Sequence, residues 1–428
     1  MNVKRIPKLL KITNCTVLDP YAGKQYAGEI LLKNGKIEKV GQRVAAKSAE
    51  TFDAGGKVVS HGFLDIHAHF REPGREDKET LASGADAAVA GGFTQVCVMP
   101  NTDPPIDSPE SVRFVKEKSA DLLVDINPIG AVTMGQKGEE LTEMSAMHDE
   151  GAVAFSDDGI PIMDSGVLRR ALEYSGPLGV PIINHAEDLA LKLDGQIHEG
   201  EWSTRLGLAG VPDVSESSMV ARDIQLMEFT AGKLHVPHVS SRKSVEWIAG
   251  AKHNGLRVTA EVTPHHLYFT DADIHTYDTN LKVAPPIRSA SDRLALVEAV
   301  KDGTIDCIAT DHAPHTVEEK EAPFDWAPNG MIGLESAFGA AWRILSEAGC
   351  DLMHVVRLLT SAPRQIMGFE TDLLAAGQPA QLTILDPNEE WTFSTELIYS
   401  KSRNSPFVGR KLRGRISAVI TDGKMCIL

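Results

Sequence analysis

The middle of the chain, residues 61–370, alternates short apolar runs with longer segments that have an amphipathic helical pattern. Short apolar runs are typical of buried parallel strands, and eight strand–helix units follow one another. Eight units predict a closed (β/α)8 barrel, with an open doubly wound sheet as the alternative. The predicted strands are Phe63–Ile66, Gln95–Met99, Asp125–Gly130, Ala152–Phe155, Val180–Ile183, His235–Val239, Arg257–Val262 and Asp306–Ala309.

The two ends of the chain contain only short strand-like runs. Turn signals such as Asn34-Gly35 and Asp422-Gly423 separate them, as is typical of β-hairpins. The sequence therefore predicts one small β-rich domain built from residues 1–60 and 371–428, beside a barrel of residues 61–370. The alternative is that each end only decorates the barrel. The predicted strands here are Lys11–Leu18, Glu29–Lys33, Lys36–Val40, Lys57–Ser60, Ala380–Leu385, Arg415–Thr421 and Lys424–Ile427.

Histidine and aspartate residues lie at or just beyond the ends of most predicted barrel strands. The carboxyl ends of barrel strands face one shared mouth, where the active sites of such barrels lie. Buried imidazoles and carboxylates cost free energy unless they are paired or bound to a metal, so core packing does not account for this set. The candidate metal ligands are His67, His69, Asp158, His185, His238 and Asp311.

The ligand types indicate what such a site holds. His67 and His69 are spaced two apart, which places both rings on one face of a strand, although one such pair alone fits a hydrogen-bonded core equally well. Six nitrogen and oxygen ligands suit two ions with one bridging carboxylate. The absence of cysteine favours catalytic zinc, with Mn or Co as alternatives. Two ions that share a water lower its pKa from about 15.7 towards about 7, which indicates hydrolysis, or its reverse, at a carbonyl.

Three residues are candidates for direct contact with a substrate or its protons. Arg71 offers a planar charged group suited to a carboxylate. Asp311 can ligate a metal and also carry a proton from water to a leaving nitrogen. His315, four residues further on, either reaches the substrate or is an ordinary surface histidine.

Composition narrows the function classes. The chain has 428 residues and a net charge of -16, which argues against nucleic acid and anionic membranes as partners. There is no apolar run of about 18 residues, so no membrane span is expected. The five cysteines are scattered and the N-terminus has no apolar leader segment. We therefore expect a cytoplasmic protein with reduced thiols.

Taken together, these motifs strongly resemble the dihydroorotases of the cyclic amidohydrolase superfamily, in particular the bacterial type I group. The resemblance covers essentially the whole chain. It rests on Asp65-Ile66-His67-Ala68-His69-Phe70-Arg71-Glu72-Pro73-Gly74, Met99-Pro100-Asn101-Thr102, Phe155-Ser156-Asp157-Asp158-Gly159, Asn184-His185-Ala186-Glu187-Asp188, His238-Val239-Ser240, Val262-Thr263-Pro264-His265-His266-Leu267 and Ala309-Thr310-Asp311-His312-Ala313-Pro314-His315.

The resemblance implies a barrel beside a small β domain. It also implies the reversible cyclisation of N-carbamoyl-L-aspartate to L-dihydroorotate in pyrimidine synthesis. By motif, the candidate ligands resemble those of two zinc ions, with Asp158 as the bridge and Asp311 as both ligand and proton shuttle. The residues that resemble substrate contacts are Arg71, Asn101, His315, Asn329 and Gly330.

The bridging position separates this group from its relatives. Hydantoinases, dihydropyrimidinases, allantoinases and another dihydroorotase class resemble this chain but use a carboxylated lysine there, whereas residues 153–160 contain no lysine. Asp157 and Asp158 are both possible bridges, and the motif favours Asp158. One alternative is another cyclic amidase, acting on hydantoins or allantoin. Another is a non-catalytic relative that scaffolds aspartate carbamoyltransferase.

One position departs from the family pattern. Ala284 stands before Pro285-Pro286, where many relatives carry a substrate-binding asparagine. We expect a nearby side chain or a water to replace that contact, with Asn280 as one candidate. The expected partners are a small-molecule substrate, a second copy of the chain in a homodimer, and aspartate carbamoyltransferase.

Overall fold

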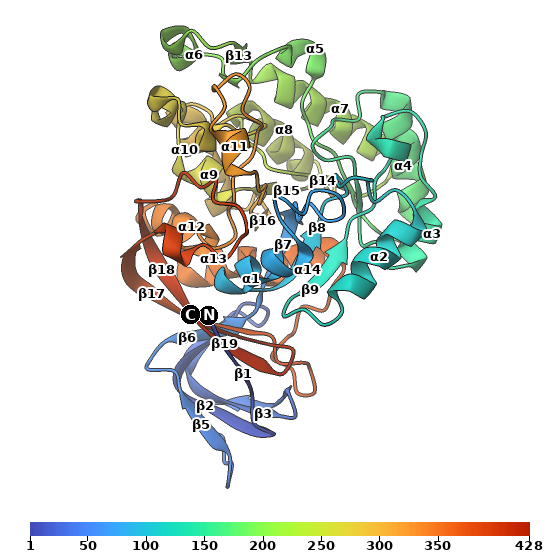
Figure 1. The fold of residues 1–428 in the computed structure, drawn as a ribbon. Helices are drawn as coiled ribbons and strands as arrows, with labels where there is room; N and C mark the ends of the chain where they lie inside the picture. Colours follow the sequence, from blue (N-terminus) through green and yellow to red (C-terminus); the bar gives the residue numbers. More distant parts are fainter.

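The computed structural model describes residues 1–428 and contains a closed barrel of eight parallel strands (Figure 1). Two parallel sheets, β7-β8-β9 and β10-β11-β14-β15-β16, make up the wall. Bridges between Gly130 and Phe155 and between Ala68 and His312 join the two sheets into a ring. The strands are β7 (Phe63–Ala68), β8 (Phe93–Val98), β9 (Asp125–Pro128), β10 (Phe155–Ser156), β11 (Ile182–Ile183), β14 (Leu234–Val236), β15 (Thr259–Val262) and β16 (Cys307–Ile308).

Helices surround this ring and bury its outer face. Most of the long ones begin at a side-chain cap, such as Thr80 before α1 and Ser108 before α2, which satisfies free backbone N–H groups. The surrounding helices are α1 (Leu81–Ala90), α2 (Pro109–Ser119), α3 (Met144–Asp149), α4 (Ser165–Leu178), α7 (Val214–Thr230), α8 (Arg242–His253), α10 (Ala290–Asp302), α12 (Ala337–Glu347) and α13 (Leu352–Leu358). Short helices on the loops are α5 (Leu189–Lys192), α6 (Glu201–Leu206), α9 (Pro264–Tyr268) and α11 (Val317–Lys320).

The inside of the barrel is a packed core. Ten buried side chains fill it, including Leu64 and Ile66 of β7, Cys307 of β16 and Met367 of α14 (Ser361–Met367). A larger cluster of 64 buried residues lies mainly between the wall and the surrounding helices. The polar site can therefore only lie above this apolar layer, at the carboxyl ends of the strands.

Both ends of the chain contribute to one nine-stranded sheet, which lies at the foot of the barrel in Figure 1. Its order is β1-β19-β18-β17-β6-β2-β3-β4, with β5 paired to β2. The fold class predicted from the sequence is thus confirmed. The strands are β1 (Asn2–Arg5), β2 (Leu9–Asp19), β3 (Lys24–Lys33), β4 (Lys36–Gly41), β5 (Glu50–Asp53), β6 (Val58–His61), β17 (Leu382–Thr392), β18 (Lys411–Thr421) and β19 (Lys424–Ile427).

The structure differs from the prediction at some strand bounds. β1 and β5 were not predicted, because their residues are mostly exposed and polar. The predicted strand His235–Val239 ends at Val236 in the structure. Pro237 follows, and a proline has no N–H to donate to a strand ladder. His238 therefore lies beyond the strand, with a φ of 34° that a non-glycine residue seldom adopts.

Candidate active site

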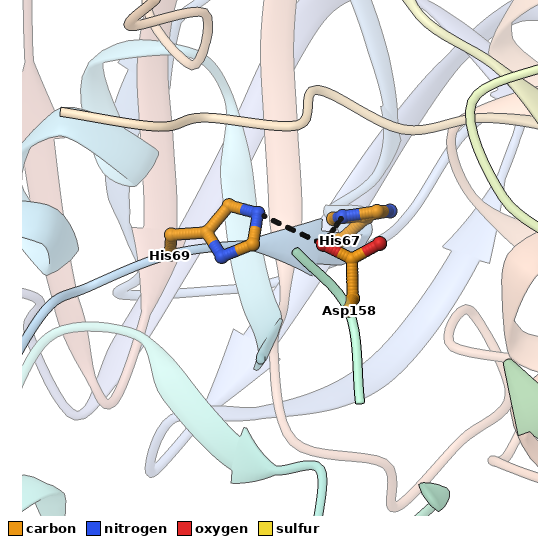
Figure 2. A group of neighbouring side chains, drawn as sticks. All are labelled: His67, His69 and Asp158. Carbon is orange, nitrogen blue, oxygen red and sulfur yellow. Dashed lines mark ion pairs between the residues drawn. The ribbon is translucent and has the colours of Figure 1, made fainter. Parts of the chain in front are cut away.

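The six candidate ligands converge at the mouth of the barrel. His67 and His69 come from the end of β7, and the carboxylate of Asp158, just after β10, lies between them (Figure 2). Asp158 Oδ2 is 3.3 Å from His67 Nε2 and 3.5 Å from His69 Nε2. Its other oxygen, Oδ1, is 3.1 Å from His238 Nε2 and 3.4 Å from His185 Nδ1.

Backbone irregularities aim these side chains into the mouth. The register between β7 and β8 shifts by one residue between Asp65 and Ala68, a bulge of the kind that re-aims side chains at active sites. The Asp311 N–H donates to the His67 carbonyl oxygen at 2.9 Å, which holds the last strand end against the first. Asp311 has a φ of 48°, and its carboxylate lies 3.0 Å from His69 Nε2. Backbone strain of this kind is concentrated at functional sites.

The electrostatic environment of the cluster keeps its two carboxyl groups, Asp158 and Asp311, ionised. Burial alone would raise the pKa of Asp158, but the surrounding imidazoles of His67, His185 and His238 hold the pKa of that carboxyl well below its usual range. Burial likewise opposes ionisation of Asp311, yet the neighbouring His69 and the other imidazoles keep its pKa low. Both carboxylates are therefore charged at neutral pH and offer oxygen atoms to a cation.

The donor set fits two cations that share one carboxylate. The ligand atoms of His67, His69 and Asp158 lie within 4.8 Å of one another, and so do those of Asp158, His185 and His238. His67 Nε2 is buried without any hydrogen-bond partner, as expected for a nitrogen whose partner is a metal. Imidazole and carboxylate donors without cysteine match catalytic zinc sites.

Glu261, in the middle of β15, is a site residue that the sequence did not reveal. Its Oε1 accepts a hydrogen bond from His67 Nδ1 at 2.6 Å and one from the His238 N–H at 3.1 Å. Its Oε2 accepts from His235 Nε2 at 3.1 Å. A carboxylate behind a ligating histidine fixes the ring and its tautomer, so Glu261 leaves His67 Nε2 free for a metal.

A third group of metal-ligating residue types, His235, Glu261 and Cys307, does not form a separate metal site. Both oxygens of Glu261 are already committed to N–H donors. Burial raises the pKa of the Cys307 thiol well above its usual range, so Cys307 remains a protonated, poor ligand. Within this group Glu261 supports the candidate ligands, and the three residues are not a ligand set themselves.

Two more side chains lie behind the ligands. His69 Nδ1 donates to Asn101 Oδ1 at 2.8 Å, which leaves the Asn101 Nδ2 amide free to face the mouth. His185 Nε2 lies 3.4 Å from Glu187 Oε2, and Lys192 Nζ also donates to that oxygen. By contrast, Asp157 accepts from the N–H groups of Val132 and Thr133 and takes no part in the cluster.

The candidate ligands open onto a cavity of about 200 Å³ that is lined mostly by polar residues. All five residues that were predicted to contact substrate line it, namely Arg71, Asn101, His315, Asn329 and Gly330. Arg71 Nε donates to the Pro314 carbonyl oxygen at 3.3 Å, and its two terminal nitrogens have no protein partner. Ala284 also lines the cavity, whereas Asn280, the candidate replacement for the missing asparagine, does not.

His315 is more constrained than its motif implied. Its Nε2 donates to the Asn329 carbonyl oxygen at 2.8 Å, and its Nδ1 faces Glu319 at 3.1 Å. Burial and the nearby cations Arg71, Lys78 and Lys320 lower the pKa of His315 to about 3. His315 is therefore neutral at pH 7 and holds the Asn329–Gly330 segment against the cavity.

Curated relatives resemble this chain over nearly its whole length. A protein named dihydroorotase from Pelotomaculum thermopropionicum is 48% identical over 97% of this chain and 98% of its own. One of the same name from Aquifex aeolicus is 43% identical over 97% of this chain and 98% of its own. The model of the family described as Dihydro-orotase-like matches residues 56–244 of this chain.

The chain belongs to the dihydroorotase family.

Solved structures place this dihydroorotase family member within a wider fold group. The L-hydantoinase, or dihydropyrimidinase, from Arthrobacter aurescens is 26% identical, with a TM-score of 0.86 over 96% of this chain and 94% of its own. A D-hydantoinase from Thermus sp. shares the fold at 23% identity, with a TM-score of 0.83 over 98% of this chain and 95% of its own. No helix of the chain is both long and apolar enough to cross a membrane.

Proposed function

We propose that this family member interconverts L-dihydroorotate and N-carbamoyl-L-aspartate, as its relatives' name and its site residues indicate, and does so with two zinc ions. The observation that carries the proposal is a cluster of four imidazoles around the Asp158 carboxylate, which opens onto a cavity that is also lined by Arg71 with its two free terminal nitrogens. The first ion would be held by His67, His69 and Asp158, and the second by Asp158, His185 and His238.

Bound at this site, the ions would polarise a carbonyl group and lower the pKa of a water molecule. The chain itself supplies the proton path. In ring opening, the water oxygen adds to the carbonyl carbon and the carbon–nitrogen bond breaks. Asp311, anionic and 3.0 Å from His69, takes the proton of the water and delivers it to the departing nitrogen. Ring closure runs through the same steps in reverse.

Arg71 orients the substrate. Dihydroorotate carries one carboxylate, and the two free terminal nitrogens of Arg71 can bind it as a bidentate pair. The free Nδ2 amide of Asn101 is a second donor for the same carboxylate. His315 Nε2 already donates to the Asn329 carbonyl oxygen. His315 can therefore donate to the substrate only if this hydrogen bond is replaced by one to the substrate.

Purified protein tests the proposal. Metal content is measured first, then cyclisation of carbamoyl aspartate at mildly acid pH and hydrolysis of dihydroorotate at alkaline pH. We expect about two zinc ions per chain and turnover in both directions. A His67→Ala variant should lose both zinc and activity. Turnover of hydantoin or allantoin in place of dihydroorotate would favour the other cyclic amidases, and a metal-free inactive chain would favour a scaffold.

The proposal includes two assemblies, a homodimer and a complex with aspartate carbamoyltransferase. Both are tested by measuring the mass of the purified chain, alone and mixed with that enzyme.

The proposal also includes the domain boundaries, a barrel of residues 61–370 and a β domain of residues 1–60 and 371–428. Limited proteolysis tests these boundaries.

A further inference from the structure

Glu187 and Lys192 form a charged pair on the cavity wall that the mechanism above does not use. Both residues line the cavity. Glu187 is only 1% exposed, and its Oε2 accepts from both His185 and Lys192. Its other oxygen, Oε1, is buried without any hydrogen-bond partner. A buried carboxylate oxygen without a partner is costly, which points to a ligand that donates to it.

Lys192 has donors to spare in the same place. Asp188 caps the short helix α5 through the N–H groups of Ala190 and Leu191. The Lys192 N–H donates to the Asp188 carbonyl oxygen at 2.8 Å, which keeps the lysine beside Glu187. An ammonium group carries three N–H donors, and Glu187 is the only protein partner of this one. Apart from histidines, Arg71 and Lys192 are the two basic residues that line the cavity.

The substrate has one polar group left without a partner. In the proposed reaction Arg71 takes the carboxylate, and the ring amide that opens lies at the ligand cluster. The remaining group is the ureide, which presents a carbonyl oxygen beside an N–H. Ala284 has no polar side-chain atom to offer it, and Asn280 is not in the cavity wall.

We propose that Glu187 and Lys192 bind the ureide of the substrate, with Lys192 Nζ donating to its carbonyl oxygen and Glu187 Oε1 accepting from its N–H. This inference rests on the proposed dihydroorotase reaction. It assigns to a pair following β11 a contact that the Ala284 side chain cannot make. Lys192 and Glu187 are then specificity residues, since a ligand without a ureide would leave both groups unsatisfied.

The test compares two ligands on the zinc-loaded protein by titration calorimetry, which does not depend on turnover. Orotate carries both the carboxylate and the ureide, whereas succinate carries carboxylates alone. In Lys192→Met we expect the dissociation constant of orotate to rise about 10- to 100-fold, the loss expected for one hydrogen bond to a charged group. The constant for succinate should change little. Lys192→Arg, which keeps a charged donor, should recover part of the orotate affinity.

The control is Lys243→Met, because Lys243 forms a similar ion pair with Glu246 at 2.6 Å but does not line the cavity. Its affinity for both ligands should match that of the unaltered protein. Equal weakening of orotate and succinate in Lys192→Met would overturn the ureide assignment in favour of a general charge effect. Loss of zinc from Lys192→Met would also overturn the ureide assignment, because the Glu187–Lys192 pair would then act by holding His185 in place as a metal ligand. A failure of the proposed reaction shows separately, as absent turnover in the unaltered protein.

Discussion

Replacing Glu261 by glutamine removes one negative charge from behind the ligands while keeping the shape of the side chain. Three N–H donors point at this carboxylate, from His67, His238 and His235. A glutamine offers a single acceptor oxygen, so its NH₂ group must face one of the donors. The His67 ring then loses the carboxylate that fixes its tautomer, and His67 becomes a weaker metal ligand.

The magnitude follows from how such supporting carboxylates act elsewhere. Their loss weakens metal binding by about 10- to 100-fold, or roughly 1.4–2.8 kcal/mol. Zinc affinity is measured by competition with a chelator, and thermal unfolding in excess zinc shows whether the variant still folds. Cys307→Ala is the control, because Cys307 belongs to the same buried group but supports no ligand. The reasoning fails if Glu261→Gln holds zinc as tightly as the original chain, or if Cys307→Ala loses it.

Three further outcomes are expected. Asp311→Asn should keep most of its zinc yet lose about 10²- to 10⁴-fold in turnover in both directions, and near-normal rates would remove the proton-shuttle role. Ala284→Asn should lower the KM for dihydroorotate about fivefold by adding one hydrogen bond, worth roughly 1 kcal/mol, and an unchanged KM would show that position 284 is not limiting. Burial lowers the pKa of Lys320 from 10.5 to about 7. Between these two values the lysine is protonated in the unfolded chain but neutral in the folded one, so the free energy of unfolding rises with pH. Relative to Lys320→Met, the original chain should gain about 2.5 kcal/mol of unfolding free energy between pH 6 and pH 9 in urea titrations, and a constant difference would contradict the shift.

The site residues that the sequence predicted are those that lie close in sequence to a recognisable apolar strand. His67 and His69 come at the end of one apolar run, and Asp311 comes two residues after another, Asp306–Ala309, so the end of each strand and its candidate ligand were visible together. The choice of Asp158 over Asp157 came from a family motif, and the structure puts Asp158 among the imidazoles. Exact strand ends were less predictable. The predicted strand His235–Val239 contains His238, whereas in the structure the strand ends at Val236, directly before Pro237.

The sequence did not reveal Glu261, which lies behind the candidate ligands, because its contacts form only when the barrel closes. Glu261 and His67 are 194 residues apart, and only the ring of strands brings the middle of β15 against the end of β7. In sequence terms Glu261 is a charged residue in an apolar strand, which burial should penalise. Three converging N–H donors offset that penalty, and each of them belongs to a histidine at or beside the ligand cluster. A buried carboxylate that breaks the apolar pattern of a barrel strand is therefore itself a signal of a neighbouring metal site, and Glu261 could have been found by asking which donors would have to meet it.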